Sequence, residues 1–525
     1  MTTQHTKNQL PIGIQTFREI REGDYYYVDK TDYACQLANQ GKYFFLSRPR
    51  RFGKSLFLDT LKELFEGNRD QFTGLIAENQ WDWSQRYPVI RISFGSGVVR
   101  DRQELDAIIG ERLKDNAKSL AIELSTIEAP TFSGQFTALI RQAYEQHSNK
   151  VVVLIDEYDK PILDNIEDAQ QAAIVREGVK NLYSALKDAD PWLRFVLLTG
   201  VSKFSKVSLF SGINNLRDIT LTPQYSSICG YTELDVDTIF APELAGLDRQ
   251  QIQEWYNGYN WGGESVYNPF DLLLLFADRQ FRFFWFETGS PSFLITLFQQ
   301  QKVFLPSLAD IEVDETILDS FDIERINPIT LLFQTGYLTI DKMTVDELGE
   351  MSYTLRVPNR EVASALNSHF IGSYAELHSQ RKVQRNRLYH CLHNGDLPAL
   401  QREIQAVFAA IPWRNFRHDL PQTEGYYASV LYAFFASLHA TVIPEDISNQ
   451  GQADMTIMLG DYIYVMELKR DTRTDYQVNP ENPALQQIIE RRYADKYQSS
   501  GKRVFQVGLI FNTHARNLVQ MDWVS

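Results

Sequence analysis

The sequence predicts an α/β protein in three parts: a parallel sheet covered by helices, a largely helical middle, and a C-terminal domain ordered α-β-β-β-α-β. Two observations predict it. From residue 43 to residue 200, short β-branched or aromatic runs alternate with helix-length segments, which is typical of a parallel sheet. From residue 424 to residue 511, a helix precedes three strand-like runs, a second helix and a fourth strand. We place the parts at residues 1–230, 231–375 and 376–525.

Composition limits the functions open to the chain. Its 525 residues suffice for several cores, and the net charge of −15 argues against a general nucleic-acid binder, so nucleic acid must be met by local basic surface. Cys35, Cys229 and Cys391 are too scattered for a metal motif and too few for a disulfide framework. No apolar run approaches the ~18 residues of a membrane span. We therefore expect no membrane association and a cytoplasmic location.

A short segment after the first strand carries the first functional motif. The stretch SRPRRFGKSLFL, residues 47–58, leads from a strand-like run into an apolar helix. Gly53, Lys54 and Ser55 fit the end of a phosphate-binding loop, in which backbone N–H groups surround phosphate, the Lys reaches the outer phosphates and the Ser holds magnesium. Arg48 stands where the first glycine of that loop is expected. The loop must therefore make its opening turn differently.

A second motif strengthens the prediction of a nucleotide site. The stretch VVVLIDEYDKP, residues 151–161, reads as a buried parallel strand that ends in two adjacent carboxylates. In P-loop enzymes such a strand lies beside the loop, its Asp binds magnesium and the following acid polarises the attacking water. Asp156 and Glu157 have these positions here. We therefore predict binding of ATP or GTP.

Three further side chains are candidates with an alternative role each. Arg50 and Arg51, inside the loop, could neutralise phosphate charge or be solvated surface cations. Thr199 ends the strand-like run at residues 194–200, at the carboxyl edge where open sheets bind ligands. Its hydroxyl could sense the outermost phosphate or cap the strand.

Six segments resemble the AAA-ATPase-like family of bacterial proteins: LPIGIQTFREI, YYYVDKTDY, RPRRFGKSL, IDEYDKPI, LTGVSKFS and NNLRDIT. In that family the RPRRFGKS form of the loop is usual, so the resemblance implies a working site despite Arg48. It implies ATP as the nucleotide, Lys54 and Ser55 on phosphate and magnesium, and Asp156 with Glu157 as the acidic pair. Such modules often form rings, so a homo-oligomer is plausible, although no arginine finger can be named. The chemistry of the YVDKT stretch stays open.

The middle of the chain shows no catalytic pattern. Its aromatic clusters are typical of packed cores. The segments at residues 327–340 and 351–362 read as helix, strand, turn, strand and helix, which is similar to a winged-helix module. The turn DKMTVDELGE is acidic and would repel phosphate, so we expect a linking role. Beyond it lie four cations, which could contact phosphate or form a solvated helix face: Arg381, Lys382, Arg385 and Arg387.

The C-terminal part predicts a metal site on a β-hairpin. Gly460 and Asp461 form a plausible two-residue turn between the strands at residues 452–459 and 462–469, and this turn places Asp454 opposite Glu467. Two opposed carboxylates destabilise an antiparallel pair unless a cation lies between them. Lys469 shares the strand face of Glu467 because side chains alternate along a strand. Hard oxygen ligands suit Mg²⁺ and leave room for phosphate and a water. The alternative is an ordinary surface hairpin.

The hairpin, the helix ALQQIIERRYADKY and the strand VGLIF resemble the PD-(D/E)XK nuclease superfamily, whose core is restriction-endonuclease-like. The resemblance implies that Asp454 is the motif Asp, that Glu467 and Lys469 are the E-x-K pair, and that Glu424 completes the metal ligands. Gln487 and Tyr493 match helix positions that face the active site. Ala453 replaces the Pro of the superfamily name, as in many members.

Together these patterns predict an ATP-binding and ATP-hydrolysing protein with a Mg²⁺-dependent DNA endonuclease domain regulated by ATP. The alternative is an ATP-gated nucleic-acid-binding or protein-assembly module whose nuclease fold does not cut. A third possibility is an ATPase whose C-terminal domain binds protein partners.

Overall fold

The computed structural model describes residues 8–123, 129–203, 215–285, 311–319, 326–375, 381–411, 423–438 and 440–525. They form two compact units. The described parts of Met1–Phe293 and Glu312–Arg360 make the first unit, and those of Glu361–Ser525 make the second. Within the described ranges, no helix combines the length and apolarity needed to cross a bilayer. The domain bounds expected from the sequence stay predictions.

The first unit contains the predicted parallel sheet. Its strand order is β2-β3-β4-β1-β5, and every neighbouring pair is parallel. The strands are β1 (Tyr43–Ser47), β2 (Val89–Ser93), β3 (Val151–Asp156), β4 (Leu193–Gly200) and β5 (Arg217–Asp218). Every residue of β1 and β3 is buried, which explains their continuous apolar runs. The carboxyl ends of β1, β3 and β4 meet at one edge of the sheet.

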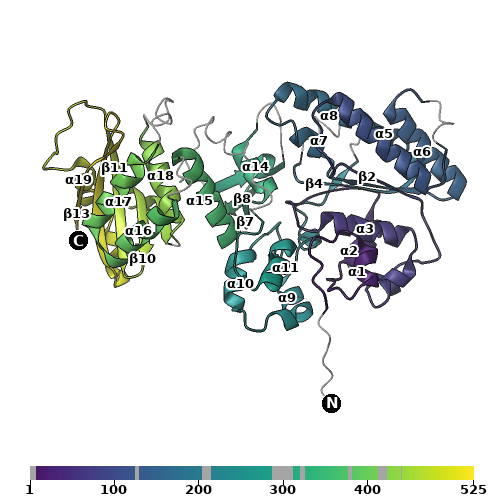
Figure 1. The fold of residues 1–525 in the computed structure, drawn as a ribbon, viewed down its shortest axis with the longest axis horizontal. Helices are drawn as coiled ribbons and strands as arrows, with labels where there is room; N and C mark the ends of the chain where they lie inside the picture. Colours follow the sequence, from purple (N-terminus) through teal and green to yellow (C-terminus); the bar gives the residue numbers. More distant parts are fainter. Residues whose placement is uncertain are drawn as a thin grey trace, which may run out of the picture. The chain divides into compact units, whose positions relative to one another are not determined.

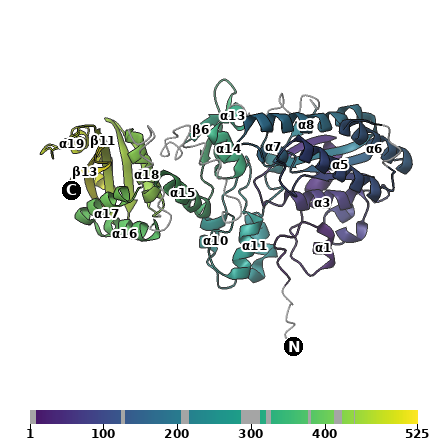
Figure 2. The ribbon, with the colours of Figure 1, turned by 45° about the horizontal axis from the view of Figure 1, so that its top comes forward.

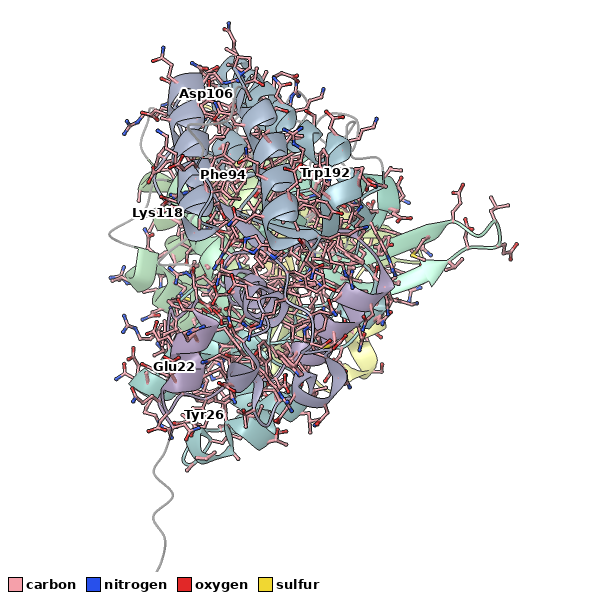
Figure 3. The ribbon with its side chains drawn as sticks, turned by 90° about the vertical axis from the view of Figure 1, so that its right-hand side faces the viewer. Glu22, Tyr26, Phe94, Asp106, Lys118 and Trp192 are labelled. Carbon is pink, nitrogen blue, oxygen red and sulfur yellow. The ribbon has the colours of Figure 1, made fainter. Side chains whose placement is uncertain are left out.

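Helices cover both faces of this sheet (Figures 1 and 2). One face carries α5 (Arg102–Ser119), α6 (Phe132–His147) and α8 (Ala169–Asp188), and the other carries α1 (Phe17–Glu22), α2 (Thr31–Gln40) and α3 (Lys54–Phe65). Figure 3 shows Asp106 and Lys118 on the first of these helical layers and Glu22 and Tyr26 on the opposite side of Phe94. Short elements complete this part: α4 (Ala77–Gln80), α7 (Lys160–Leu163), η1 (Arg69–Phe72), η3 (Asp190–Trp192) and η4 (Pro223–Tyr225).

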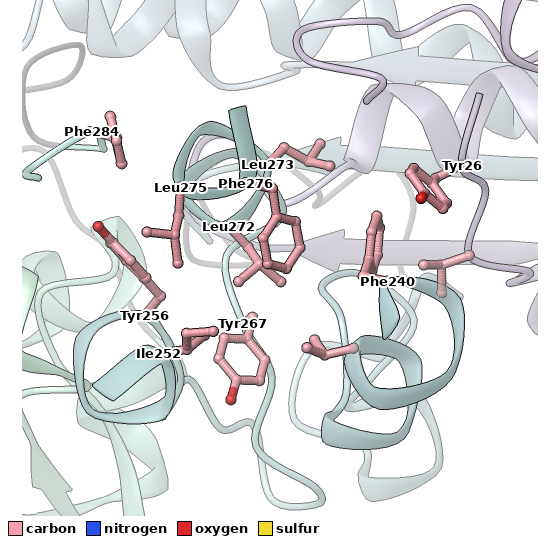
Figure 4. Close-up of a cluster of buried hydrophobic side chains, with 12 residues drawn as sticks. Tyr26, Phe240, Ile252, Tyr256, Tyr267, Leu272, Leu273, Leu275, Phe276 and Phe284 are labelled. Carbon is pink, nitrogen blue, oxygen red and sulfur yellow. The ribbon is translucent and has the colours of Figure 1, made fainter. Parts of the chain in front are cut away.

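A helical cluster extends the first unit beyond residue 230. It contains α9 (Glu233–Ile239), η5 (Ala241–Glu243), α10 (Arg249–Tyr256) and α11 (Pro269–Asp278). The aromatic side chains of this segment, Phe240, Tyr256 and Tyr267 among them, are buried in one hydrophobic core (Figure 4). Tyr26 and Val28, from the start of the chain, belong to the same core. The prediction that these aromatics are packed core residues is confirmed.

The predicted helix, strand, turn, strand and helix follow in order. They are α14 (Pro328–Thr335), β7 (Thr339–Val345), β8 (Met351–Arg356) and α15 (Arg360–Ala375). A third strand, β6 (Ile311–Asp314), joins the small sheet in the order β6-β8-β7, and α13 (Glu315–Asp319) follows it. The first residues of the expected acidic turn belong to β7, so the turn itself is residues 346–350, and Asp341 on β7 pairs with Arg356 on β8 at 2.8 Å.

The second unit contains a five-stranded mixed sheet in the order β13-β12-β11-β10-β9. Its elements are α16 (Arg381–Asn394), α17 (Leu397–Ala409), α18 (Glu424–Ala436), β9 (Thr441–Ser448), β10 (Gly451–Leu459), β11 (Tyr462–Asp471), α19 (Pro483–Glu490), η10 (Asp495–Ser500), β12 (Arg503–Asn512) and β13 (Asn517–Val524). The pair β11–β12 is parallel and the other pairs are antiparallel. The predicted α-β-β-β-α-β order is confirmed.

Two details of this unit differ from the expected elements. The helix expected at residues 482–497 ends at Glu490, because Arg492 adopts a left-handed backbone with φ of 52° and the chain continues as η10. The strand β13 was missed. It follows β12 after a short turn and pairs with it along the outer edge of the sheet.

Candidate functional sites

The phosphate loop of the first unit joins the end of β1 to the start of α3. Gly53 caps α3 with φ of 93°, a left-handed conformation that glycine adopts without steric cost, and Lys54 begins the helix. The first N–H groups of α3 therefore face the loop, where they can bind an anion. The predicted position of the loop, between a strand and a helix N-terminus, is confirmed.

Arg48 explains how the loop folds without its first glycine. Its side chain is fully buried, and the guanidinium donates hydrogen bonds to the carbonyl groups of Thr220 at 2.9 Å and Tyr225 at 3.0 Å. The guanidinium also lies 4.1 Å from the ring centroid of Trp261. Burial lowers the pKa of Arg48 to about 10. Arg48 is thus a brace that ties the loop to the chain after β5, and it is turned away from the phosphate position.

Lys54 is held by the loop itself. Its ammonium group donates to the carbonyl oxygens of Arg48 at 2.8 Å and Pro49 at 2.9 Å. Burial lowers the pKa of Lys54, although the carboxylate of Asp156 opposes that effect. The side chain is therefore satisfied before any phosphate arrives, and a phosphate must replace these carbonyl groups as its partner.

The acidic strand places its two carboxylates differently. Asp156 is buried at the end of β3, where its carboxylate accepts a hydrogen bond of 2.8 Å from the hydroxyl of Thr199 on β4. Glu157 has φ of 51°, which is unusual for a non-glycine residue, and this backbone turns its side chain into the cavity beside the loop. Burial and the neighbouring Asp156 raise the pKa of Glu157. Thr199 therefore orients Asp156 directly.

A third carboxylate of this motif was missed as a contributor. Asp159 is buried and accepts hydrogen bonds from the backbone N–H of Val201 at 3.0 Å and of Ser202 at 2.6 Å. It fixes the turn after β4. Gly200 is required there, because a Cβ at that position would lie 2.5 Å from the Asp159 carboxylate. A carboxylate two residues after Glu157 was the available signal.

A cavity of about 440 Å³ opens in front of the phosphate loop. Six of the candidate residues of the nucleotide site line this cavity: Arg50, Arg51, Gly53, Lys54, Ser55 and Glu157. Asp156 and Thr199, at the ends of β3 and β4, are not part of its lining. The opposite wall is apolar and comes from two other segments: Ile14, Val28, Tyr231, Phe270 and Leu273. This wall was not predicted, because its residues look like ordinary core positions in the sequence. The volume and the mixed polar and apolar lining of the cavity suit a ligand that joins a flat, partly apolar group to phosphates.

Arg51 bridges the loop and the helical cluster. Its backbone is left-handed, with φ of 68°, and its guanidinium lies 3.9 Å from the centroid of the Phe270 ring on α11. Burial lowers the pKa of Arg51, and the charge of Asp271 opposes that effect. Arg51 is exposed overall, although its guanidinium lies over the Phe270 ring. Arg50 is also exposed and lines the same cavity.

The YVDKT stretch, whose chemistry was left open, builds part of this cavity. Tyr27, Val28 and Lys30 line it. Lys30 pairs with Asp235 of α9 at 3.0 Å, and Asp29 accepts hydrogen bonds from Thr31. The stretch thus connects the start of the chain to the helical cluster and shapes the wall opposite the loop.

The second candidate site lies on the hairpin of the second unit. The register pairs Met455 with Met466 and Leu459 with Tyr462, as predicted, and Gly460 adopts φ of 57° in the turn. Asp454 and Glu467 follow the last ladder pair, Met455 with Met466, on opposite strands of the hairpin. The Asp454 carboxylate accepts a 2.6 Å hydrogen bond from the backbone N–H of Leu468.

Glu467 is the centre of a small polar network. Its Oε1 accepts hydrogen bonds from the ammonium group of Lys469 at 2.8 Å and from the amide of Gln487 on α19. Gln487 also donates to the hydroxyl of Tyr493 at 3.4 Å. The predicted grouping of these residues is therefore present. Glu424, at the first turn of α18, accepts from the backbone N–H of Arg470 at 3.2 Å on the neighbouring strand β11.

Burial and mutual repulsion disfavour the charged form of the carboxylates in this network. Burial and the charge of Glu467 raise the pKa of Asp454 to about 7, and burial also raises the pKa of Glu467. Burial alone would lower the pKa of Lys469, but the hydrogen bond to Glu467 and the nearby carboxylates raise it. The second oxygen of Glu467, Oε2, is buried and has no hydrogen-bond partner among the described residues.

These observations fit a divalent cation bound by Asp454 and Glu467. An unpartnered buried carboxylate oxygen and carboxyl groups with raised pKa values are the features that a cation would relieve. In the described ranges no three acidic, His or Cys side chains already stand close enough to form a ready-made metal cage. A site with two carboxylates and several waters is what Mg²⁺ prefers.

The basic stretch predicted near residue 385 is a helix surface on α16. Arg387 is exposed and lies 3.8 Å from Glu403 of α17. Arg385 is half-buried. The side chains of Arg381 and Lys382 lie outside the part of the structure that is described.

Comparison with known proteins agrees with this arrangement of two sites. Residues 11–210 match the AAA-ATPase-like family, described as "Predicted AAA-ATPase", and residues 422–521 match the PD-(D/E)XK nuclease superfamily. These are the classes that the parallel sheet with its phosphate loop and the carboxylate hairpin define.

A full-length relative extends the match. The chain is 49% identical over 517 residues, 98% of each chain, to an "Uncharacterized protein in vnfD 5'region" of Azotobacter chroococcum mcd 1. The chain therefore belongs to the same family as that protein, in which an AAA-ATPase-like domain precedes a PD-(D/E)XK nuclease superfamily domain. No solved structure matches the chain.

Proposed function

We propose that this protein binds and hydrolyses ATP, and that it cuts DNA with a Mg²⁺-dependent endonuclease site whose activity depends on the nucleotide. The observation that carries the nuclease proposal is the unpartnered Oε2 of Glu467, buried beside Asp454 and Lys469. Burying a carboxylate oxygen without a partner costs free energy. A metal-dependent nuclease keeps such an oxygen because it binds the metal ion.

At the nuclease site, Asp454 and Glu467 would hold Mg²⁺, and Glu424 would contribute through a bridging water, because the three carboxylates do not already form a metal cage in the described ranges. When bound, the ion supplies Lewis acidity and lowers the pKa of a coordinated water. Lys469 already lies against Glu467 at 2.8 Å, so its ammonium group can orient a water or balance negative charge on a phosphate. Gln487 holds the Glu467 carboxylate in place through its amide.

At the nucleotide site, the N–H groups at the start of α3 and Lys54 would bind the phosphates. Ser55 and Asp156 would hold the Mg²⁺ that accompanies ATP, with Thr199 fixing Asp156. Glu157 lines the same cavity and is the candidate for orienting the attacking water. Arg50 and Arg51 are placed to balance phosphate charge at the cavity wall.

The dependence of cutting on nucleotide rests on the order of the two domains in one chain. The second candidate, an ATP-gated binding or assembly module that does not cut, shares every feature of the nucleotide site. A cytoplasmic location is supported by the three buried free cysteines, Cys35, Cys229 and Cys391. Formation of a homo-oligomer is part of the proposal and is tested by measuring particle mass with and without ATP.

The test incubates the full-length protein with supercoiled, linear and single-stranded DNA and Mg²⁺, with and without ATP. We expect cutting by the wild type, no cutting by Glu467→Gln, and altered nucleotide dependence in Lys54→Ala. Matched controls are Asp461→Asn, an exposed carboxylate at the turn end of the same hairpin, and Lys118→Ala, an exposed lysine of α5. Absence of cutting on every DNA, together with ATP turnover that Lys54→Ala abolishes, would favour the binding module.

A further inference from the structure

A wide polar groove adjoins the carboxylate hairpin of the second unit. It has a volume of about 890 Å³ and is bounded by the β9–β10 turn, the chain before α19, and α19 itself. Its inner end includes Gln487 and Tyr493, so one side chain separates the groove from Glu467. A ligand that fills the groove therefore lies next to the candidate metal site, with Gln487 between them.

The charge of the groove argues against the backbone of duplex DNA. Its charged lining consists of Glu481, Glu490 and Arg491, two carboxylates against one guanidinium. Affinity for duplex DNA comes chiefly from cations placed on phosphates. A surface with net negative lining offers little of that attraction to a duplex or to a single strand, so binding in this groove must come from uncharged contacts.

The uncharged lining instead suits the edges of exposed bases. Gln450, Asn479 and Gln486 bring three side-chain amides to the groove, and all three residues are exposed. Each amide carries both donors and an acceptor, which is the combination that pairs with base edges. Unpaired bases present these edges freely, whereas a duplex keeps them in its grooves.

The wall formed by α19 is rigid. Asn482 caps the helix and donates to the carbonyl of Gly508 on β12 at 3.1 Å. A Cβ on Gly508 would lie 2.4 Å from the backbone nitrogen of Leu485, so the helix rests directly on the strand. Gln486 and Gln487 are therefore presented from a fixed element, at a fixed distance from Glu467.

We propose that this groove binds unpaired nucleotides and makes the protein selective for single-stranded DNA, or for single-stranded stretches within a duplex. The amides of Gln450, Asn479 and Gln486 contact base edges while the strand's phosphate reaches Asp454 and Glu467. This inference rests on the nuclease function proposed above and specifies its substrate.

The experiment compares cutting of three labelled DNAs of one sequence: a single strand, the full duplex, and the duplex with a central unpaired bubble. The full-length protein is used with Mg²⁺ and ATP. We expect the single strand and the bubble to be cut at least ~10-fold faster than the duplex. Gln450→Ala and Gln486→Ala should each slow single-strand cutting several-fold, and Gln498→Ala, an exposed amide outside the groove, should not.

Binding separates failure of the groove from failure of the nuclease. Fluorescence anisotropy with Glu467→Gln protein and the same DNAs should show preference for the single strand, reduced by Gln450→Ala and Gln486→Ala. Equal or better cutting and binding of the duplex, unaffected by these substitutions, would overturn the groove proposal. Single-strand binding that depends on the amides, without cutting of any DNA by the wild type, would refute the nuclease and support the groove.

Discussion

The two candidate sites treat a buried ionisable group in opposite ways. At the nucleotide site, the ammonium group of Lys54 donates to two carbonyl oxygens of its own loop. The two terminal nitrogens of Arg48 donate to carbonyl groups of another segment, and its buried Nε has no hydrogen-bond partner among the described residues. At the hairpin, Glu467 keeps one buried oxygen without a partner, and the pKa of Asp454 is raised to about 7. The cations of the first site are held mainly by carbonyl groups that the fold supplies, whereas the carboxylates of the second site lie close enough together to raise the pKa of Asp454.

This difference predicts how each site changes when its ligand binds. A phosphate at the loop must take Lys54 from partners that the fold provides, so binding is an exchange of hydrogen bonds. A cation at the hairpin fills a deficit and removes the repulsion between Asp454 and Glu467. Metal should therefore stabilise the second unit, whereas the nucleotide loop should keep its shape with or without ATP.

The largest effect is expected when the carboxylate charge of Glu467 is removed. Glu467→Gln removes the charge that a cation would bind, so cutting should fall by ~1000-fold or more, on the order of 4 kcal/mol in transition-state stabilisation. Mg²⁺ should raise the melting temperature of the wild type and of Asp461→Asn, and should leave that of Glu467→Gln unchanged. A Mg²⁺-dependent shift that persists in Glu467→Gln would place the cation elsewhere.

The next largest effect is expected when Arg48, the brace of the phosphate loop, is removed. Arg48→Gly restores the glycine of the usual phosphate loop, yet it leaves the carbonyl groups of Thr220 and Tyr225 without their donor and removes the packing on Trp261. We expect a loss of roughly 3 kcal/mol in the free energy of unfolding, measured by urea denaturation. Arg141→Gly, at an exposed position of α6, gives the cost of a helical glycine for comparison, about 1 kcal/mol. An Arg48→Gly protein as stable as the wild type would show that the brace is dispensable.

A smaller effect concerns Lys54 and its exchange of partners. Lys54→Ala should weaken ATP binding by roughly 30-fold, about 2 kcal/mol, because one charge-assisted contact to phosphate is lost and its partners inside the loop are lost with it. Isothermal titration calorimetry measures the change, and Lys118→Ala should bind ATP like the wild type. Unchanged affinity in Lys54→Ala would remove this loop from the nucleotide site.

The smallest effect is expected for a substitution outside both sites, which gives a reference value for the change in the free energy of unfolding. Arg387 is 61% exposed and its guanidinium lies 3.8 Å from Oε2 of Glu403, whose side chain is 21% exposed. Arg387→Ala should change the free energy of unfolding of the second unit by less than ~0.5 kcal/mol. A loss above ~1 kcal/mol would mean that this helix surface carries an interaction beyond the pair.

The sequence predicted those parts of the sites that follow from strand geometry. Strand alternation and a two-residue turn were enough to place Asp454, Glu467 and Lys469 together, because the register of a tight hairpin is set locally. Gly53 and Lys54 were equally predictable, since the turn between a strand and a helix N-terminus is local. Their roles in binding stay predictions.

The remainder depended on contacts between distant segments. No local pattern indicates that Arg48 reaches Tyr225, that Lys30 reaches Asp235, or that Phe270 lies over Arg51. The strand β13 was missed because its polar and apolar residues alternate only weakly, with a shift in register near Ile510 and Phe511. Tertiary packing decides such features.

The shared core of Tyr26, Val28 and the helices after residue 230 has a consequence for how such proteins recombine. A gene rearrangement that exchanges the nuclease portion can preserve the ATP-binding part only if its junction lies beyond α11, because an earlier junction strips one wall from the cavity and exposes Tyr26 and Val28 to water. Since the first unit also includes Glu312–Arg360, viable natural fusions should inherit the chain up to Arg360 as one piece.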